Sequence, residues 1–427
     1  MSSSLLPSQV LNDQPKQFYH SQDIAQMRIL HYLHMTMQAE ETLMLQLSRL
    51  GGHSGSSIEQ HIVTTDNTAS IPTKNLFIHY LSGIGHHTFI SSFSIKRLYF
   101  QILSEVLPDI VHVHGAWDYS IYQIIQYSRQ KGFIVVYSPD KGLEPSIISI
   151  DFWKKKLPRL IAYQFRAVRK ADALLAVSAT ERKHLEELGW NRRIGHLRLS
   201  ISPEETNTPQ LYSQYLAFYT RVLNSNIRRF MTLNAWDAFT ALLYAGCRQS
   251  DAPNMLSAEY LSRLHSLHSQ EWNCLQVFAA AEGVSGQIAR GVEMLRLQMP
   301  ALAPSVLAVL PSSTYRPLFP TGSPVKEDTL CEALASTKKM VEDKKLKFAH
   351  LSELYIALRY TEYDEDKLMA LLHRHRLINF TAGLLQILYE YILLEEGYMP
   401  LPPSHNRHAD IIRKCLTKTN KYYETSL

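Results

Sequence analysis

Short apolar runs alternate with helical stretches through the first half of the chain. The runs are rich in Val and Ile, and each ends in a polar or Gly-bearing turn. Such continuous runs are typical of strands buried on both faces, and strands that alternate with helices pair in parallel. The pattern predicts an open parallel α/β domain over residues 24–201. The expected strands are Met27–Leu33, His61–Thr65, Leu76–Leu81, Asp109–His114, Phe133–Ser138, Ala173–Ser178 and Ile194–Ile201.

The pattern changes after a polar, Pro-flanked segment at residues 202–210, which we expect to be a linker. Residues 211–427 show the 3.6-residue period and predict an all-α domain, interrupted by a Pro-rich extended segment at 300–324. Residues 1–23 are polar and form an expected flexible lead-in. The expected helices of the second domain are Leu211–Ile227, Arg229–Gly246, Ser257–Ala281, Gly286–Gln298, Lys326–Lys345, Ser352–Leu358, Glu365–Arg374 and Phe380–Glu395.

Composition excludes several classes of protein. The formal charge of +5 comes from 44 basic and 39 acidic residues, and this mild excess over 427 residues does not indicate nucleic-acid binding. No apolar run reaches the ~18 residues of a membrane span, and the amino terminus lacks the basic and apolar regions of a signal peptide. The four cysteines are far apart, as reduced, buried thiols would be. We therefore expect a cytoplasmic protein.

Polar residues follow the fourth and fifth predicted strands, where parallel sheets bind ligands. His112 and His114 are two apart on one strand, so they share a face, and His114 lies at the strand end. In a sugar site, His114 would bond a hydroxyl and Trp117 would stack on a sugar face. The alternative is that His114 bonds a loop carbonyl and Trp117 packs against the following helix. The residues alone leave both open.

Four pieces of sequence, in a specific order, carry a resemblance to a known family. They are VHVHGAW at 111–117, YSPDKGLEP at 137–145, KKLPRLIAYQFRAVRKADALLAVSATE at 155–181 and HLEELG at 184–189. Together they resemble the amino-terminal half of family-4 glycosyltransferases of the two-Rossmann-domain type, and the likeness covers residues 27 to 201. The resemblance implies a Rossmann-like domain that transfers a hexose from a nucleotide sugar to an acceptor in surface-polysaccharide assembly.

The resemblance also implies a site and its partners. His114 and Asp140 would be the catalytic residues, and Gly115, Trp117, Lys141 and Gly142 would bind the substrate. Neither a metal nor a cofactor is expected beyond the nucleotide sugar as co-substrate. The expected partners are a glycan acceptor and a second glycosyltransferase, with no nucleic acid.

Departures from the family pattern favour an alternative without catalysis. The Gly-rich turn after the first strand is replaced by HMTMQAEE at 34–41, and Asp140 stands where relatives commonly have His. An ionised Asp only accepts hydrogen bonds, whereas a His can donate one, and the Asp140–Lys141 pair can also be a simple ion pair. Donor-binding motifs are missing from residues 200–427. The alternative is a non-catalytic glycosyltransferase-like protein that binds a glycan or a partner protein, so whether the chain is an enzyme stays open.

Three further motifs have competing interpretations. Residues 151–170 form a basic amphipathic stretch, which is either a solvated surface helix or an interfacial helix that touches anionic lipid at the inner face of the membrane. Glu181 in SATE is expected to be a capping partner of Ser178. The pairs His86-His87 and His373-x-His375 lack a third ligand at suitable spacing and predict no metal site.

Overall fold

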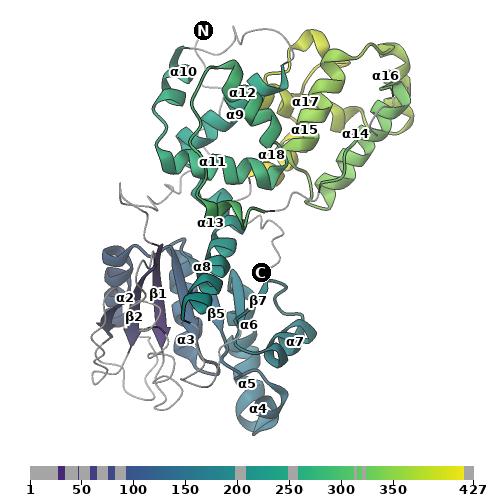
Figure 1. The fold of residues 1–427 in the computed structure, drawn as a ribbon. Helices are drawn as coiled ribbons and strands as arrows, with labels where there is room; N and C mark the ends of the chain where they lie inside the picture. The colour runs from purple at the N-terminus through teal and green to yellow at the C-terminus, as the bar shows by residue number, and fades with distance from the viewer. Residues whose placement is uncertain are drawn as a thin grey trace. The chain divides into compact units, whose positions relative to one another are not determined.

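The computed structural model divides into two compact units, one built on a sheet and one helical, and the division falls after Leu223 (Figure 1). It describes residues 27–33, 47, 58–64, 76–81, 93–197, 208–248, 258–311, 315–319 and 324–417. The expected lead-in 1–23, the turn 34–41, the pair His86-His87 and all but residues 208–210 of the expected linker lie outside these ranges.

Seven parallel strands form the sheet of the first unit, in the order β3-β2-β1-β4-β5-β6-β7 (Figure 1). The parallel α/β prediction is confirmed, and all seven predicted strands form. The second begins three residues before its predicted start, because Ile58 already pairs with Met27 of the first strand. The bounds are β1 Met27–Leu33, β2 Ile58–Thr64, β3 Leu76–Tyr80, β4 Ile110–His114, β5 Ile134–Ser138, β6 Ala173–Ala176 and β7 Ile194–His196.

Helices cover both faces of this sheet. On one face, α2 (Phe93–Val106), α3 (Tyr119–Gln130), α6 (Phe165–Lys170) and α7 (Ala179–Leu188) enclose a core that includes Val111, Val135 and Leu174. On the other face lies α8 (Thr208–Ser225), so close that a Cβ on Gly195 would lie 2.2 Å from a ring carbon of Phe218. Both faces are buried, which explains why the strands are almost continuously apolar.

The stretch 151–170 is helical, as expected, but the helix is irregular. After α4 (Pro145–Ser149), the chain forms two π-helical turns, η1 (Phe152–Lys156) and η2 (Leu160–Gln164), on either side of α5 (Leu157–Arg159). Pro158 lies within α5 and has no N–H to donate, so a regular α-helical ladder cannot pass through it. The wider π turns accommodate the missing bond.

As predicted, all the regular secondary structure in the described residues of the second unit is helical. Its elements are η3 (Ile227–Phe230), α9 (Leu233–Cys247), α10 (Ala258–His265), α11 (Ser269–Glu282), α12 (Ser285–Met294), α13 (Pro304–Leu307), α14 (Glu327–Glu342), α15 (Phe348–Tyr360), α16 (Glu365–Arg374), α17 (Ile378–Ile392), η4 (Glu396–Tyr398) and α18 (Arg407–Thr417). None of the helices among the described residues is long and apolar enough to cross a membrane.

Caps explain where the helix predictions were wrong. The helix expected over 257–281 is divided, because the backbone N–H of His268 donates to Glu271 and starts α11 anew. The helix expected over 229–246 starts instead at Leu233, where Thr232 Oγ1 accepts from the N–H of Ala235. The Pro-rich segment 300–324, expected to be extended, contains the short helix α13, which begins at Pro304.

The core of the helical unit contains an aromatic cluster. The ring of Phe239 lies 4.8 Å from that of Phe278 and 5.1 Å from that of Phe348, and Trp236 packs beside all three. The guanidinium of Arg228 stacks 3.7 Å from the centre of the Trp236 ring. Edge-to-face rings and a stacked cation favour one specific packing over a loose apolar collapse.

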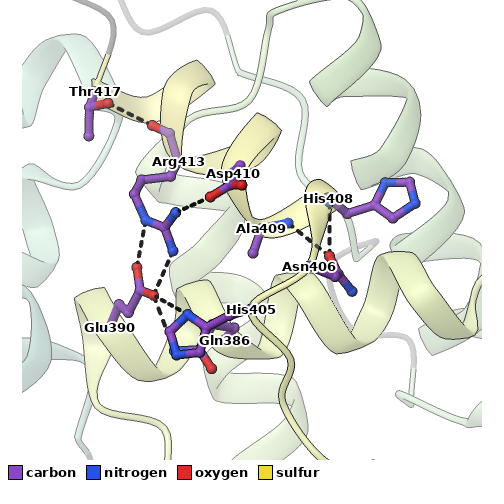
Figure 2. A network of polar contacts seen from close by, with 9 residues as sticks. All are labelled: Gln386, Glu390, His405, Asn406, His408, Ala409, Asp410, Arg413 and Thr417. Atoms are coloured by element: carbon purple, nitrogen blue, oxygen red, sulfur yellow. Dashed lines mark hydrogen bonds and ion pairs between the residues drawn. The ribbon is translucent and has the colours of Figure 1, made fainter. Parts of the chain in front are cut away.

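A polar network fastens α18 to α17 (Figure 2). Arg413 donates two hydrogen bonds to the carboxylate of Glu390, at 3.0 and 2.7 Å, and a third to Asp410. Asn406 Oδ1 accepts from the backbone N–H groups of His408 and Ala409 and so caps α18. The bidentate pair fixes the orientation of the last described helix, which the sequence analysis did not predict.

Candidate functional site

The strand order reverses between β1 and β4, which is where open parallel sheets form a ligand crevice at their carboxyl ends. Three histidines lie at this point on one face of the sheet. His31 of β1 is paired in register with His112 of β4, and His114 follows two residues later on the same strand. All three side chains are buried.

The three imidazoles touch one another. His31 Nδ1 lies 3.1 Å from His114 Nε2, and the rings of His112 and His114 have centroids 4.0 Å apart. His112 is held on both sides, with Nδ1 2.7 Å from the Tyr219 hydroxyl of α8 and Nε2 2.8 Å from Ser138 Oγ of β5. One ring nitrogen of each histidine lies within 4.8 Å of the others, so the cluster could hold a metal ion.

Burial controls the charge of His31 and His112. It lowers the pKa of both His31 and His112 well below the ordinary value of 6.5, and the neighbouring histidines lower it further. Both rings are therefore neutral at pH 7, and each has one nitrogen that donates and one that accepts. A neutral imidazole can bond a hydroxyl or ligate a metal.

Asp140 approaches the histidines from the loop after β5. Its Oδ2 accepts a hydrogen bond from the backbone N–H of Gly115 at 3.0 Å and lies 3.5 Å from Nδ1 of His114. The Asp140 carboxylate thus lies beside the His114 ring. The Asp140 side chain is 32% exposed, whereas that of His114 is 7% exposed, so the carboxylate faces solvent in front of the buried ring.

The loop that carries Asp140 has an unusual backbone. Asp140 and Lys141 have φ values of 49° and 64°, in the left-handed region that favours glycine, and the N–H of Gly142 closes the turn on the Pro139 carbonyl. A Cβ on Gly142 would lie 2.5 Å from that of Ala116. Strain of this kind persists where the surroundings enforce it, and here it brings the two loops after β4 and β5 together.

Glu181 holds that turn in place by a hydrogen bond to its backbone. Its carboxylate accepts the backbone N–H of Lys141 at 2.6 Å and that of Val177 at 2.9 Å. Burial raises the pKa of Glu181, and the two backbone bonds partly oppose the shift. The expected cap is also present, since Ser178 Oγ accepts from the N–H of Glu181. Glu181 therefore both belongs to the start of α7 and positions the site loop.

Trp117 serves in packing more than as an open surface on which a sugar ring could stack. It packs partly against the sheet core, its indole N–H donates to the carbonyl of Gly142 at 2.6 Å, and the Lys156 ammonium lies 5.5 Å from its ring centre. Its φ of 66° is also in the left-handed region. The side chain of Lys141 is exposed. Among the predicted site residues, the structure brings together His114, Gly115 and Asp140, with Gly142 supporting them.

Sequence reasoning missed His31, Ser138 and Tyr219. His31 lies in the run MRILHYL, where a polar residue in an otherwise apolar central strand is a signal that could have been used. Ser138 ends β5 next to the predicted loop. Tyr219 lies in an amphipathic helix more than a hundred residues after His112, and no pattern in the chain marks it.

No family model matches the chain, and no curated protein is significantly similar to it. The function therefore has to be argued from the site.

Proposed function

We propose that the sheet unit is a glycosyltransferase-like domain that binds a sugar-containing ligand at the carboxyl ends of β1, β4 and β5. The observation that carries this proposal is the partly exposed Asp140 carboxylate held beside His114 at the reversal of strand order. The resemblance of residues 27 to 201 to family-4 glycosyltransferases supplies the ligand class, which is a nucleotide sugar or a glycan.

The chemistry of the strand ends suits hydroxyl groups. Asp140 accepts hydrogen bonds, and a sugar hydroxyl can donate one while accepting another from a neighbouring donor. The exposed ammonium of Lys141 adds such a donor, and it also suits the phosphates of a nucleotide sugar. These polar groups lie on a rigid frame, because Glu181 and Gly142 fix the loop by backbone contacts.

Transfer of a hexose is the second candidate function. The His114–Asp140 pair favours it, because a carboxylate beside an imidazole can orient the ring to remove a proton from an acceptor hydroxyl. Binding leads, because His114 Nε2 is already engaged by His31 and its side chain is almost fully buried. In this reading, a glycan or a partner glycosyltransferase is the binding partner of a domain that does not itself catalyse transfer.

Titration with sugar ligands tests the proposal. Calorimetry and thermal unfolding of the full chain would use a panel of nucleotide sugars, free nucleotides and oligosaccharides. A ligand at 100 times its dissociation constant should stabilise the folded protein by about 2.7 kcal/mol. We expect Asp140→Ala to abolish the shift, because the exposed acceptor is lost.

The matched control is Glu186→Gln on α7, a half-exposed carboxylate that pairs with Arg182 away from the loop, and it should bind as the wild type does. A protein that responds to no member of the panel, or equally in both variants, would refute the proposal. If mass spectrometry detected a glycosylated acceptor after incubation with a bound nucleotide sugar, the result would favour hexose transfer over binding as the function.

We also propose that the segment 151–170 rests on the inner face of an anionic membrane. Large apolar side chains are exposed there and immediately before it, with Trp153 79%, Ile161 67% and Ile150 59% accessible. Three lysines, Lys154, Lys155 and Lys156, follow Trp153 directly. Apolar side chains next to basic ones are what an interfacial segment needs to bind anionic lipid.

Vesicle sedimentation tests this contact. Wild-type protein should bind phosphatidylcholine vesicles that contain phosphatidylserine and bind pure phosphatidylcholine more weakly. Trp153→Ala should weaken binding through lost burial, and Lys154→Gln should weaken it roughly fivefold, since a basic residue near an anionic surface contributes about 1 kcal/mol. Leu307→Ala removes another exposed apolar side chain, 52% accessible on α13, and should change nothing. Equal binding to both kinds of vesicle would argue against the contact.

A further inference from the structure

The three buried histidines form a polar cluster inside the sheet unit. Sheet register places His31 opposite His112, and the two-residue alternation of β4 puts His114 on the same face. Three imidazoles gathered in a buried site are costly unless each polar nitrogen has a partner. The partners that the structure provides leave one nitrogen unsatisfied, because His114 Nδ1 is buried and makes no hydrogen bond.

The spacing of the ring nitrogens suits a tetrahedral ion. Imidazole nitrogens bind zinc at about 2.0–2.1 Å, which separates two ligating nitrogens by roughly 3.3 Å. His31 Nδ1 and His114 Nε2 are 3.1 Å apart, and a nitrogen of His112 lies within 4.8 Å of both. To complete the set, His112 would have to move closer, and the ion would replace one of its two hydrogen bonds as well as the bond between His31 and His114.

The surroundings supply the groups that support metal-bound histidines. A ligating histidine usually donates its other N–H to a carboxylate or hydroxyl. If His114 ligates through Nε2, its Nδ1 faces Asp140 Oδ2 at 3.5 Å, close enough for a small shift to form the bond. The nitrogen of His112 that does not ligate keeps Ser138 or Tyr219 as its partner.

We propose that His31, His112 and His114 bind one divalent transition-metal ion, with zinc as the ion that three imidazoles suit best. Asp140 is the outer partner that orients His114. Three protein ligands leave a fourth coordination position open at the carboxyl end of β4. The proposal goes beyond sugar binding and does not depend on it, because its test needs no sugar.

Cobalt and zinc titrations of the tag-free full chain, freed of metal by a chelator, test the site. Cobalt(II) should give visible absorption bands that saturate at one equivalent and disappear when zinc is added. X-ray absorption of the zinc-loaded protein should show three imidazole nitrogens at about 2.0–2.1 Å. This measurement uses only the wild-type chain, so it decides the matter even where a histidine variant does not fold.

Variants separate the ligands from their supporting residue. His31→Gln should weaken metal binding by more than 100-fold, and Asp140→Asn by about 10- to 100-fold, the usual effect of losing an outer partner. The control removes the exposed pair His373 and His375, both to Gln, and should leave affinity unchanged. Absence of cobalt absorption, sulfur or purely oxygen ligation, or loss of binding in the control variant would overturn the proposal.

Discussion

Replacing Gly246 with alanine is expected to lower the free energy of unfolding of the helical unit by about 3 kcal/mol, the upper end for forcing extra volume into a packed core. α9 and α12 cross at this residue, and an added Cβ would lie 1.7 Å from the carbonyl oxygen of Gln287. Gly291 of α12 faces α9 in the same way, with its added Cβ 2.1 Å from the oxygen of Leu242. Backbone atoms cannot rotate aside, so the helices would have to separate.

Calorimetric unfolding of the full chain measures this effect, because the two units can unfold in separate transitions. Gly286→Ala is the matched control, since it lies in α12 and an added Cβ meets nothing within 4 Å. That control should be neutral or gain up to about 1 kcal/mol from alanine's better helix propensity. If Gly246→Ala had the same free energy of unfolding as the wild type, the close crossing of the two helices would be wrong.

The sheet was predictable because the sequence pattern that indicates each strand is local. Each strand is an apolar run bounded by a turn, and strands that alternate with helices have few ways to pair. The helical unit was less predictable at its element ends. Thr232 and His268 are N-caps that lie inside stretches with a continuous helical spacing of apolar residues. The spacing alone therefore does not show that a helix begins at these residues. Pro158 signalled an irregularity, but not the π turns that absorb it.

The site was half predictable for a related reason. His114 and Asp140 follow strands, and the sheet topology alone brings strand ends together. Their contact with Gly115 needs a left-handed backbone at Asp140 and Lys141, which is rare for these residues and which Glu181 enforces from another helix. The approach of His31 to His114 depends on which strands neighbour each other. Tyr219 depends on how α8 packs on the sheet, which is tertiary information that no local pattern contains.

Asp109→Asn should make the protein more stable above pH 7 and leave its stability unchanged below about pH 4. Asp109 is 5% exposed, and its Oδ2 accepts the backbone N–H of Arg28 at 2.8 Å. Burial raises the pKa of this carboxyl to about 7, although the Arg28 bond and charge oppose the shift. Between the ordinary value of 3.8 and about 7, the folded protein therefore holds a proton that the unfolded chain has released.

This difference makes stability fall as pH rises through that window, because the unfolded state binds fewer protons. The difference between a pKa of 3.8 and one of about 7 corresponds to roughly 4 kcal/mol. Asparagine still accepts from Arg28 and never ionises, so the variant should lack this loss. Unfolding free energies of both proteins from pH 3 to pH 9 would show their difference opening between about pH 4 and 7. Glu187→Gln on exposed α7 surface is the control. Parallel curves for Asp109→Asn and the wild type would mean that this carboxyl ionises freely in the folded protein.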